Sequence, residues 1–207
     1  MGENKINITS SLAEKGLDAA KNFLGKLIGP AVEEVGLLIA DPIRAWRFNN
    51  QLRILNKAEK RIKKQGISLK KISVKNLVPL LEYSSLEEDD NLQQMWVNLF
   101  VNYVDADKSY SSSVFPYILS QLSSREAEQL NEFAENNFIS FKALLVSETE
   151  LYNLLRLGLV KQAEYLQKKA GALRIKTMHF TNDMFYLTAL GREFLVCCSN
   201  EYGDNKS

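Results

Sequence analysis

The segment from Leu77 to Val104 constrains the fold of this chain more than any other, because it joins a dense apolar periodicity to a cluster of acids. Apolar side chains recur at three- and four-residue steps through its second half: Leu92, Met95, Trp96, Leu99, Phe100 and Tyr103. A stripe of this breadth has to be buried against other elements. The segment therefore predicts a helix at the core of the fold.

Four consecutive acids precede this apolar stripe: Glu87, Glu88, Asp89 and Asp90. Ser85 and Glu88 have the Ser-x-x-Glu spacing of a capping box, in which each side chain accepts a backbone N–H from the other residue. The spacing predicts a helix that begins at Leu86, with the two aspartates in a first turn where the helix dipole favours negative charge. The acids are also a candidate acidic docking surface. They lack the spacing of a calcium-binding loop, so we expect no metal ion there.

A long basic helix is predicted ahead of these acids, from Pro42 at its first position to Gly66 at its C-terminal end. Six of its cations recur at three- and four-residue steps, so that much of the charge shares one face: Arg44, Arg47, Lys57, Lys60, Arg61 and Lys64. Two uses are open to this face. It can pair with the acids at residues 87–90 or with an acidic partner, or it can follow a phosphate backbone. We favour intramolecular pairing, because the acids are close in sequence and the net charge is only +1.

Two further helices are predicted ahead of the basic one. A capping box formed by Ser11 and Glu14 starts the first, and Gly29-Pro30 separates it from a second over Ala31–Ala40. Charged residues and a proline interrupt the apolar run of residues 23–43 before it reaches the ~20 apolar residues of a membrane span. We therefore expect ordinary burial of these helices.

The sequence also bears on the compartment. The first residues, MGENKINITSS, are polar and lack the apolar core of a secretion signal. Cys197 and Cys198 are adjacent in sequence, where a disulfide would be strained. These observations predict a reduced chain in the cytoplasm.

A different pattern follows the polar stretch DADKSYSSS, which predicts a loop after Val104. Two Ser-x-x-Glu spacings predict helix starts beyond it: Ser123 with Glu126, and Ser147 with Glu150. Gly158 predicts the end of the second of these helices.

The last part of the chain predicts a β-hairpin and a final helix. Residues 173–180 alternate between apolar and polar side chains, a polar turn follows at residues 181–183, and Met184–Leu187 returns as the second strand. Thr188 then caps the final helix. The predicted fold is mainly α, with an N-terminal helical part (residues 11–107) packed with a C-terminal winged-helix-like part (residues 115–199) that carries one β-hairpin.

A winged-helix fold does not by itself predict DNA binding. A recognition helix needs cations for phosphates, whereas the helix in that place opens with Glu148 and Glu150 and offers only Arg156. Arg174 and Lys176 of the predicted wing are the better candidates for a phosphate-facing surface. We favour a structural or protein-binding wing over nucleic-acid binding.

The sequence offers little for catalysis. His179 is the only histidine, which excludes a multi-histidine metal site, and its place in a predicted strand indicates a surface or half-buried residue. Cys197 and Cys198 have apolar neighbours and no adjacent base, which predicts buried thiols. No glycine spacing matches a phosphate-binding loop. We expect a non-enzymatic protein without catalytic residues, resident metal or cofactor.

Several short runs occur in a distinctive order. They are Gly29–Gly36 (GPAVEEVG), Arg44–Asn50 (RAWRFNN), Leu86–Leu99 (LEEDDNLQQMWVNL), and the later segments LGLV and LTALG. In this order the chain resembles the bacterial Abi-alpha (abortive infection alpha) family from Gly16 to Cys198. The resemblance implies a role in bacteriophage defence by abortive infection, and it implies no chemistry, because the shared motifs are capping and packing signatures.

The expected function is that of a non-enzymatic interaction or effector protein of an anti-phage response, with a protein partner. A regulator that binds nucleic acid through the wing and the basic helix is the first alternative. An effector that perturbs membranes through its N-terminal amphipathic helices is the second. The sequence does not predict the partner, the phage trigger, the oligomeric state or the step of host shutdown.

Overall fold

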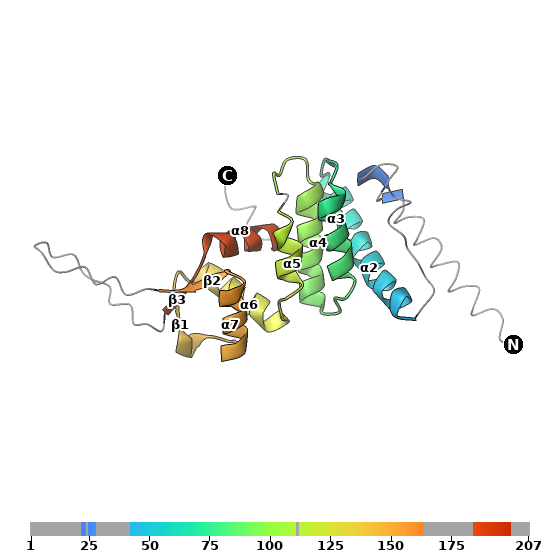
Figure 1. The fold of residues 1–207 in the computed structure, drawn as a ribbon. Coiled ribbons are helices and arrows are strands. Elements are labelled where there is room, and N and C mark those ends of the chain that lie inside the picture. Colours follow the sequence, from blue (N-terminus) through green and yellow to red (C-terminus); the bar gives the residue numbers. More distant parts are fainter. Residues whose placement is uncertain (1–21, 24, 28–41, 111, 164–183, 200–207) are drawn as a thin grey trace, which may run out of the picture. The chain divides into compact units, whose positions relative to one another are not determined.

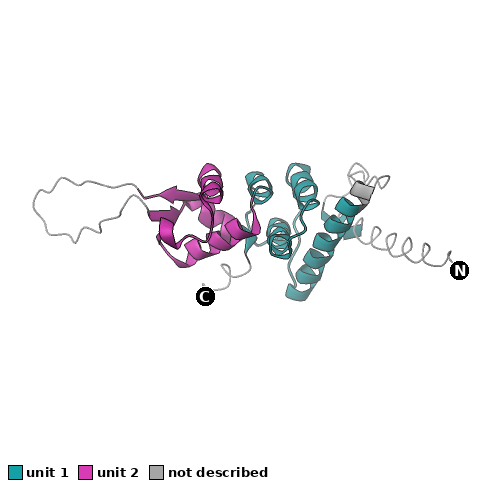
Figure 2. Cartoon of the chain, turned by 90° about the horizontal axis from the view of Figure 1, so that it is seen from below, with its two compact units in different colours: residues 1–121, 197–200 teal, residues 122–196, 201–207 magenta. Residues whose placement is uncertain are grey.

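The computed structural model describes residues 22–23, 25–27, 42–110, 112–163 and 184–199 (Figure 1). This part of the chain contains eight helices and one antiparallel sheet of three short strands, so the predicted mainly α fold is confirmed. The chain divides into two compact units, which Figure 2 distinguishes by colour. Unit 1 comprises Met1–Gln121 and Cys197–Asn200, and unit 2 comprises Leu122–Val196 and Glu201–Ser207.

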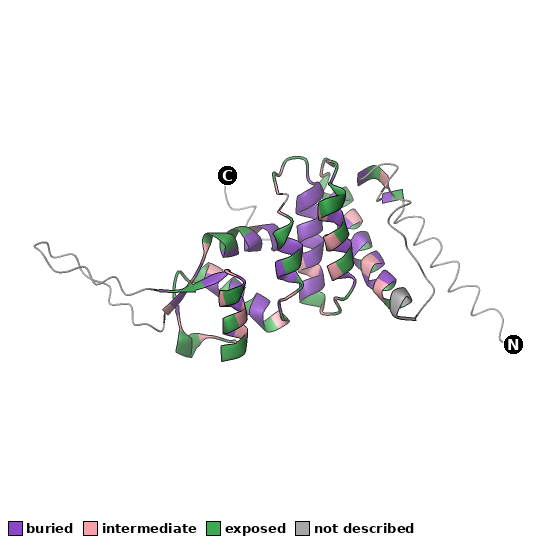
Figure 3. Ribbon diagram, in the orientation of Figure 1, coloured by how far each residue is buried: buried purple, intermediate pink, exposed green. Residues whose placement is uncertain are grey.

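Unit 1 contains the helices α2 (Pro42–Gln65), α3 (Val74–Ser84), α4 (Asp90–Val104) and α5 (Val114–Leu119). α4 contacts each of the other three helices. Figure 3 shows α4 buried along most of its length, and every residue from Trp96 to Val104 is buried. The prediction of a core helix is confirmed, and its burial extends beyond the apolar stripe that predicted it.

A short helical stretch near the N-terminus also joins this core. Phe23 and Leu27 lie one turn apart, and both are buried. The ring of Phe23 lies 5.9 Å from the ring of Phe100, and the carbonyl of Leu27 accepts the backbone N–H of Ile72 at 3.3 Å. The rest of the two predicted N-terminal helices, Ser11 to Ile28 and Ala31–Ala40, lies outside the described residues.

The start of α4 corrects one prediction. The helix begins at Asp90 rather than at Leu86, and its N-cap is Asp89, whose carboxylate accepts two first-turn N–H groups at 2.9 and 3.0 Å. The predicted capping box of Ser85 and Glu88 is wrong. Ser85 has helical dihedral angles and ends α3, whereas an N-cap residue needs an extended backbone.

The predicted basic helix is confirmed in α2, which ends just before Gly66 at φ +64°. A positive φ is accessible to glycine without a steric penalty, so the glycine ends the helix as the sequence indicates. Pro79 lies inside α3, beyond its first turn. There it removes one N–H from the hydrogen-bond ladder of that helix.

Unit 2 alternates helices with short strands. Their order is α6 (Ser124–Glu135), β1 (Ile139–Ser140), η2 (Phe141–Ala143), α7 (Glu148–Arg156), β2 (Val160–Gln162), β3 (Met184–Leu187) and α8 (Ala189–Cys198), whose last two residues belong to unit 1. Both predicted capping boxes of this part are present, at Ser123 and at Ser147. Gly158, at φ +72°, follows the end of α7 as predicted.

The sheet has the strand order β1-β3-β2, with β3 in the centre. Phe185 of β3 lies opposite Ile139 of β1 on one side and Gln162 of β2 on the other. Among the described residues, β3 therefore pairs with β1 and β2, whereas the first strand of the predicted hairpin, residues 173–180, lies outside the described residues. Alternation of apolar and polar residues indicates a pleated strand but does not indicate which strand it pairs with.

Two of the distinctive runs, LGLV and LTALG, meet at the start of α8. The Thr188 hydroxyl accepts the backbone N–H of Gly191 at 2.9 Å, so Thr188 caps the final helix as predicted. The same hydroxyl donates to the carbonyl of Gly158 at 2.6 Å. A Cβ on Gly191 would overlap the carbonyl oxygen of Leu159, so only glycine permits this close approach.

The described helices include none with both the length and the apolar character that a membrane crossing requires.

Candidate functional site

A polar seam runs between α2 and the corner where α3 passes into α4. The indole N–H of Trp46 donates to the carboxylate of Glu88 at 2.8 Å. Arg47 donates from Nε to the hydroxyl of Ser85 at 2.9 Å, and the Asn50 amide donates to the carbonyl of Ser85 at 3.0 Å. Three α2 side chains therefore fix the short connection between the two following helices.

The seam continues along α4. Nζ of Lys57 lies 3.8 Å from the carboxylate of Asp90 and 3.3 Å from Oε1 of Gln93. Arg61 donates to Oδ1 of Asn98. Because Asp90 is highly exposed, its ion pair contributes at most about 1 kcal/mol, and the seam is held mainly by hydrogen bonds to neutral groups.

The predicted acidic cluster takes part in the structure of this corner. Oε1 of Glu87 accepts the backbone N–H groups of Glu88 and Asp89 at 3.1 and 3.0 Å. Burial raises the pKa of Glu87, and these two backbone hydrogen bonds oppose the rise. Asp89 caps α4, while Glu88 and Asp90 stay exposed. The acidic surface open to a partner is therefore smaller than four residues.

The cations of the predicted basic face of α2 differ in burial. Arg47, Lys57 and Arg61 are half-buried and contact the seam. Lys60 and Lys64 are exposed. The side chain of Arg44 lies outside the described part of the structure.

The exposed side of α2 carries four cations that we call the basic stripe: Arg53, Lys60, Lys63 and Lys64. Lys63 pairs with Glu59, one turn earlier, at 2.9 Å. The other three make no hydrogen bond or ion pair with a described residue. The stripe therefore presents uncompensated positive charge to solvent.

Two asparagines of α4 hold the last turn of α8. Nδ2 of Asn98 donates to the carbonyl of Cys198 at 2.7 Å, and Nδ2 of Asn102 donates to the carbonyl of Cys197 at 2.6 Å. We call this arrangement the asparagine clamp. It supplies donors to carbonyls that have no partner within their own helix.

Each asparagine of the clamp in turn accepts a hydrogen bond from a cation. Arg61 donates to Oδ1 of Asn98, and Lys108 donates to Oδ1 of Asn102 at 2.6 Å. The positive charges thus lie behind the amides that face the C-terminal end of α8, where the helix dipole is negative. Arg61 belongs both to the seam and to the clamp.

The two cysteines at this helix end are in the thiol form and are fully buried, as predicted. Burial raises the pKa of the Cys198 thiol well above its ordinary value, with a smaller contribution from Cys197. A thiol in this state is protonated at neutral pH and is a poor nucleophile.

In unit 2, the exposed side of α7 carries few positive charges. Glu148 and Tyr152 are exposed, Tyr152 by 63%, and Arg156 is the one cation of this helix. The backbone N–H of Ser147 lowers the pKa of Glu150, which keeps its carboxylate charged. The wing residues Arg174 and Lys176, and also His179, lie outside the described residues.

Within the described ranges, no cluster of His, Cys, Asp and Glu side chains is arranged to hold a metal ion.

Three residues of these features were not predicted from the sequence. Arg53 lies on the basic stripe, and its spacing to Lys60 and Lys64 was a usable signal. Asn98 and Asn102 interrupt the apolar pattern of α4 at a spacing of four residues, which indicates two amides on one helix face. Their partners at the end of α8 are distant in sequence, and no local pattern indicates them.

Together these features describe a mainly helical protein with a polar interhelical seam, a clamp on its last helix and an exposed basic stripe. Residues 49–146 match the model of the protein family described as abortive infection alpha. The predicted resemblance is thereby confirmed over this segment, which runs from within α2 to the loop before α7 and is shorter than Gly16 to Cys198. The match to this family suggests a role in phage defence. No curated protein and no solved structure matches the chain.

Proposed function

We propose that this protein is a non-enzymatic effector of abortive infection that binds an acidic surface of a protein partner through the basic stripe of α2. The family match supports the defence role. The observation that carries the proposed binding mode is the exposure of Arg53, Lys60 and Lys64 without a partner among the described residues.

The division of the α2 cations supports this assignment. Those that the fold needs, Lys57 and Arg61, are held by Gln93, Asp90 and Asn98 in the seam. Those of the stripe contribute little to the fold, because exposed charges without partners are solvated in the folded and the unfolded chain alike. Uncompensated charge of one sign accelerates association with a surface of opposite sign and disfavours partners of like charge.

A protein partner fits the stripe better than a nucleic acid. The stripe is one helix face in which Glu59 already neutralises Lys63, and few cations remain for a phosphate backbone. Affinity for duplex DNA falls by about 0.9 log units per phosphate contact for each log unit of salt. With so few contacts, we expect only weak DNA or RNA binding that is lost near physiological salt.

A second candidate function rests on the topology of unit 2. Its order of helix, strand, helices and two further strands, with sheet order β1-β3-β2, supports the predicted winged-helix-like arrangement. In this arrangement the predicted wing residues Arg174 and Lys176 would contact phosphate. The exposed acid and tyrosine of α7 favour a protein-binding use of the same unit.

The proposal is tested with a pair of charge-reversal variants. Lys60→Glu/Lys64→Glu alters the basic stripe, and Lys142→Glu/Lys161→Glu makes the same change of net charge at exposed positions of unit 2. Each protein is used for a pull-down from phage-infected cells, with nuclease-treated and untreated lysates compared, and each is scored for protection against phage.

We expect the stripe variant to lose both binding of its partner and protection against phage, while its thermal unfolding is unchanged. The control variant should keep partner binding, protection and thermal stability. A partner that disappears on nuclease treatment would favour the nucleic-acid candidate. Loss of protection in Arg174→Ala/Lys176→Ala but not in the stripe variant would favour the wing.

A further inference from the structure

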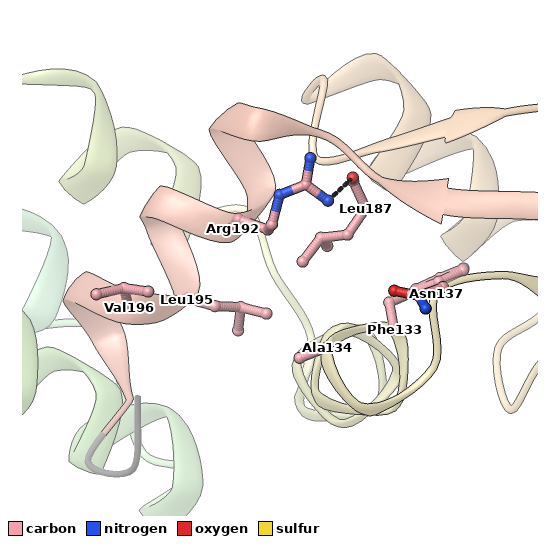
Figure 4. A pocket seen from close by; sticks show the side chains of 7 residues that line it. All are labelled: Phe133, Ala134, Asn137, Leu187, Arg192, Leu195 and Val196. Atoms are coloured by element: carbon pink, nitrogen blue, oxygen red, sulfur yellow. Dashed lines mark hydrogen bonds between the residues drawn. The ribbon is translucent and has the colours of Figure 1, made fainter. Parts of the chain in front are cut away.

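A cavity of about 130 Å³ lies within unit 2, between the C-terminal end of α6 and α8. Seven residues line it: Phe133, Ala134, Asn137, Leu187, Arg192, Leu195 and Val196. Figure 4 shows the side chains of Leu187 and Leu195 directed into the space between the two helices. None of these residues belongs to the seam, the basic stripe or the clamp, so the cavity is distinct from the site proposed above.

The inner wall of the cavity is apolar. Phe133, Leu187 and Leu195 are all almost fully buried. An engineered apolar cavity of about 150 Å³ in another protein stays dry and binds benzene. A space of this size and lining therefore accommodates an aromatic ring or a short branched alkyl group.

The rim of the cavity is polar and carries one positive charge. Nη1 of Arg192 donates to the carbonyl of Leu187 at 2.8 Å, which holds the guanidinium at the rim (Figure 4). No carboxylate of a described residue forms an ion pair with Arg192. The exposed amide of Asn137 lies among the lining residues and makes no side-chain hydrogen bond to a described residue.

We propose that this cavity binds a small carboxylate whose body is an aromatic ring or a short branched alkyl group. The apolar body fills the space against Leu187 and Leu195, and the carboxylate pairs with Arg192, with Asn137 as a second donor. A guanidinium with spare N–H groups matches the geometry of a carboxylate, and such charge-assisted bonds are stronger than neutral ones. An amine of the same shape meets a like charge at the rim.

The proposal is tested on the full chain with phenylacetate as the probe, and with phenethylamine as a probe of similar shape and opposite charge. NMR spectra of the labelled leucine methyl groups report binding at Leu187 and Leu195. We expect saturable shifts of these methyls with phenylacetate and none with phenethylamine. Arg192→Gln should weaken phenylacetate binding by about tenfold or more, as loss of a charge-assisted contact implies.

Arg125→Gln is the matched control, because Arg125 is also exposed and also donates to a backbone carbonyl, that of Leu145 at 2.6 Å, but lies outside the cavity. We expect it to bind phenylacetate as the parent chain does. Ala134→Leu fills the cavity and should abolish binding; if that variant does not fold, the methyl shifts of the parent chain decide. Absence of saturable shifts, equal binding of the amine, or full binding by Arg192→Gln would overturn the proposal.

Discussion

Asn98 and Asn102 occupy buried positions one turn apart on α4, among side chains that are otherwise apolar. Burying an amide costs stability unless its polar atoms have partners. Both polar atoms of the Asn98 amide have partners: Nδ2 donates to the carbonyl of Cys198, and Oδ1 accepts from Arg61 and Gln94. A buried amide with partners at both polar atoms specifies one arrangement of the surrounding elements, whereas an apolar residue would tolerate several.

We predict that Asn98→Ala lowers the free energy of unfolding by ~1–3 kcal/mol, because the buried carbonyl of Cys198 loses its side-chain donor. The thiol of Cys198 should also react faster with a thiol reagent in the native protein. Urea denaturation and the rate of thiol labelling measure the two effects. Gln94→Ala is the control: it removes one donor to Asn98 but leaves Arg61 in place, so we expect a smaller loss and unchanged labelling.

Three glycines should respond to alanine in a defined order. Gly191→Ala should destabilise most, since its Cβ would overlap the carbonyl oxygen of Leu159 and the backbone would have to shift. Gly158→Ala and Gly66→Ala meet no such clash, and each should cost about 1 kcal/mol for a positive φ. Thermal unfolding of the three variants gives the order. A Gly191→Ala protein as stable as Gly66→Ala would show that the start of α8 is not packed as described.

The glycines and Asn98 show which residue roles can be predicted from the sequence and which cannot. Gly66 and Gly158 follow helix ends, and a glycine after the last periodic residue of a helix is a local signal. Gly191 lies inside a helix, and what requires it is the carbonyl of Leu159, which the chain brings near only by folding. The Cys198 partner of Asn98 could not be predicted either, because folding brings it near from a distant part of the sequence.

At the scale of whole elements, the helix starts also show that a local sequence pattern predicts correctly only in the right structural context. The capping boxes at Ser123 and Ser147 follow loops, so those serines are free to adopt the extended backbone of an N-cap. Ser85 is instead the C-cap residue of α3, and its backbone N–H still donates to the carbonyl of Leu81 at 3.3 Å as in a helix. The Ser-x-x-Glu pattern therefore predicts a start correctly only where the preceding helix has ended, and Asp89 takes the cap of α4 instead.

The splitting of the α2 cations was open to prediction. The buried apolar residues of this helix mark its inner side: Phe48, Leu52, Ile54, Leu55, Ala58 and Ile62. Cations that flank that side, such as Arg61, can reach neighbouring helices, whereas Arg53 and Lys60 lie across the helix from it. A spacing of three and four residues shows only that these cations lie on the same broad part of the helix surface. The positions of the buried apolar residues show which of the cations lie close to neighbouring helices.

Two glutamates next to helix starts should give opposite pH dependences. The pKa of Glu87 is raised in the folded chain, so its contribution to stability is present below its unfolded pKa of about 4.3 and is lost as pH rises through the folded pKa. The pKa of Glu150 is lowered, so its contribution is present above the unfolded pKa and is lost as pH falls through the folded pKa.

Thermal unfolding between about pH 4 and pH 7 tests this pair. Relative to the parent chain, Glu87→Gln should become more stable as pH rises, since the Gln carbonyl oxygen can still accept the same two backbone N–H groups. Glu150→Gln should be less stable near pH 7, and its deficit should shrink towards low pH. A deficit of Glu87→Gln that grows with pH would contradict the assignment of its raised pKa to burial.

At the scale of the whole molecule, unit 1 is discontinuous in sequence. Its helices α2 to α5 come from the first part of the chain, and Cys197–Asn200 joins them after unit 2 has intervened. The two buried cysteines belong to this late segment, and their carbonyls accept the two hydrogen bonds of the asparagine clamp. Removing it should therefore affect unit 1 before it affects the sheet of unit 2.

We predict that a chain ending at Val196 loses hydrogen-exchange protection in α4 around Asn98 and Asn102, while β2 and β3 keep theirs. The reason is that burial of the late segment and both clamp hydrogen bonds disappear together. A chain ending at Ser199 is the control, and it should keep the protection of both units. Equal loss in both units after the first truncation would contradict a discontinuous unit 1.

The same discontinuity has a consequence during synthesis. A ribosome releases the chain from its N-terminus, and domains generally fold as units in that order. Unit 1 cannot follow this rule, because the cysteines that complete it are added only after all of α6, α7 and the sheet. Until then, Asn98 and Asn102 lack their helix-end acceptors and α4 lacks part of its cover. Completion of the first unit thus reports that α6, α7 and the sheet of the second unit have already been translated.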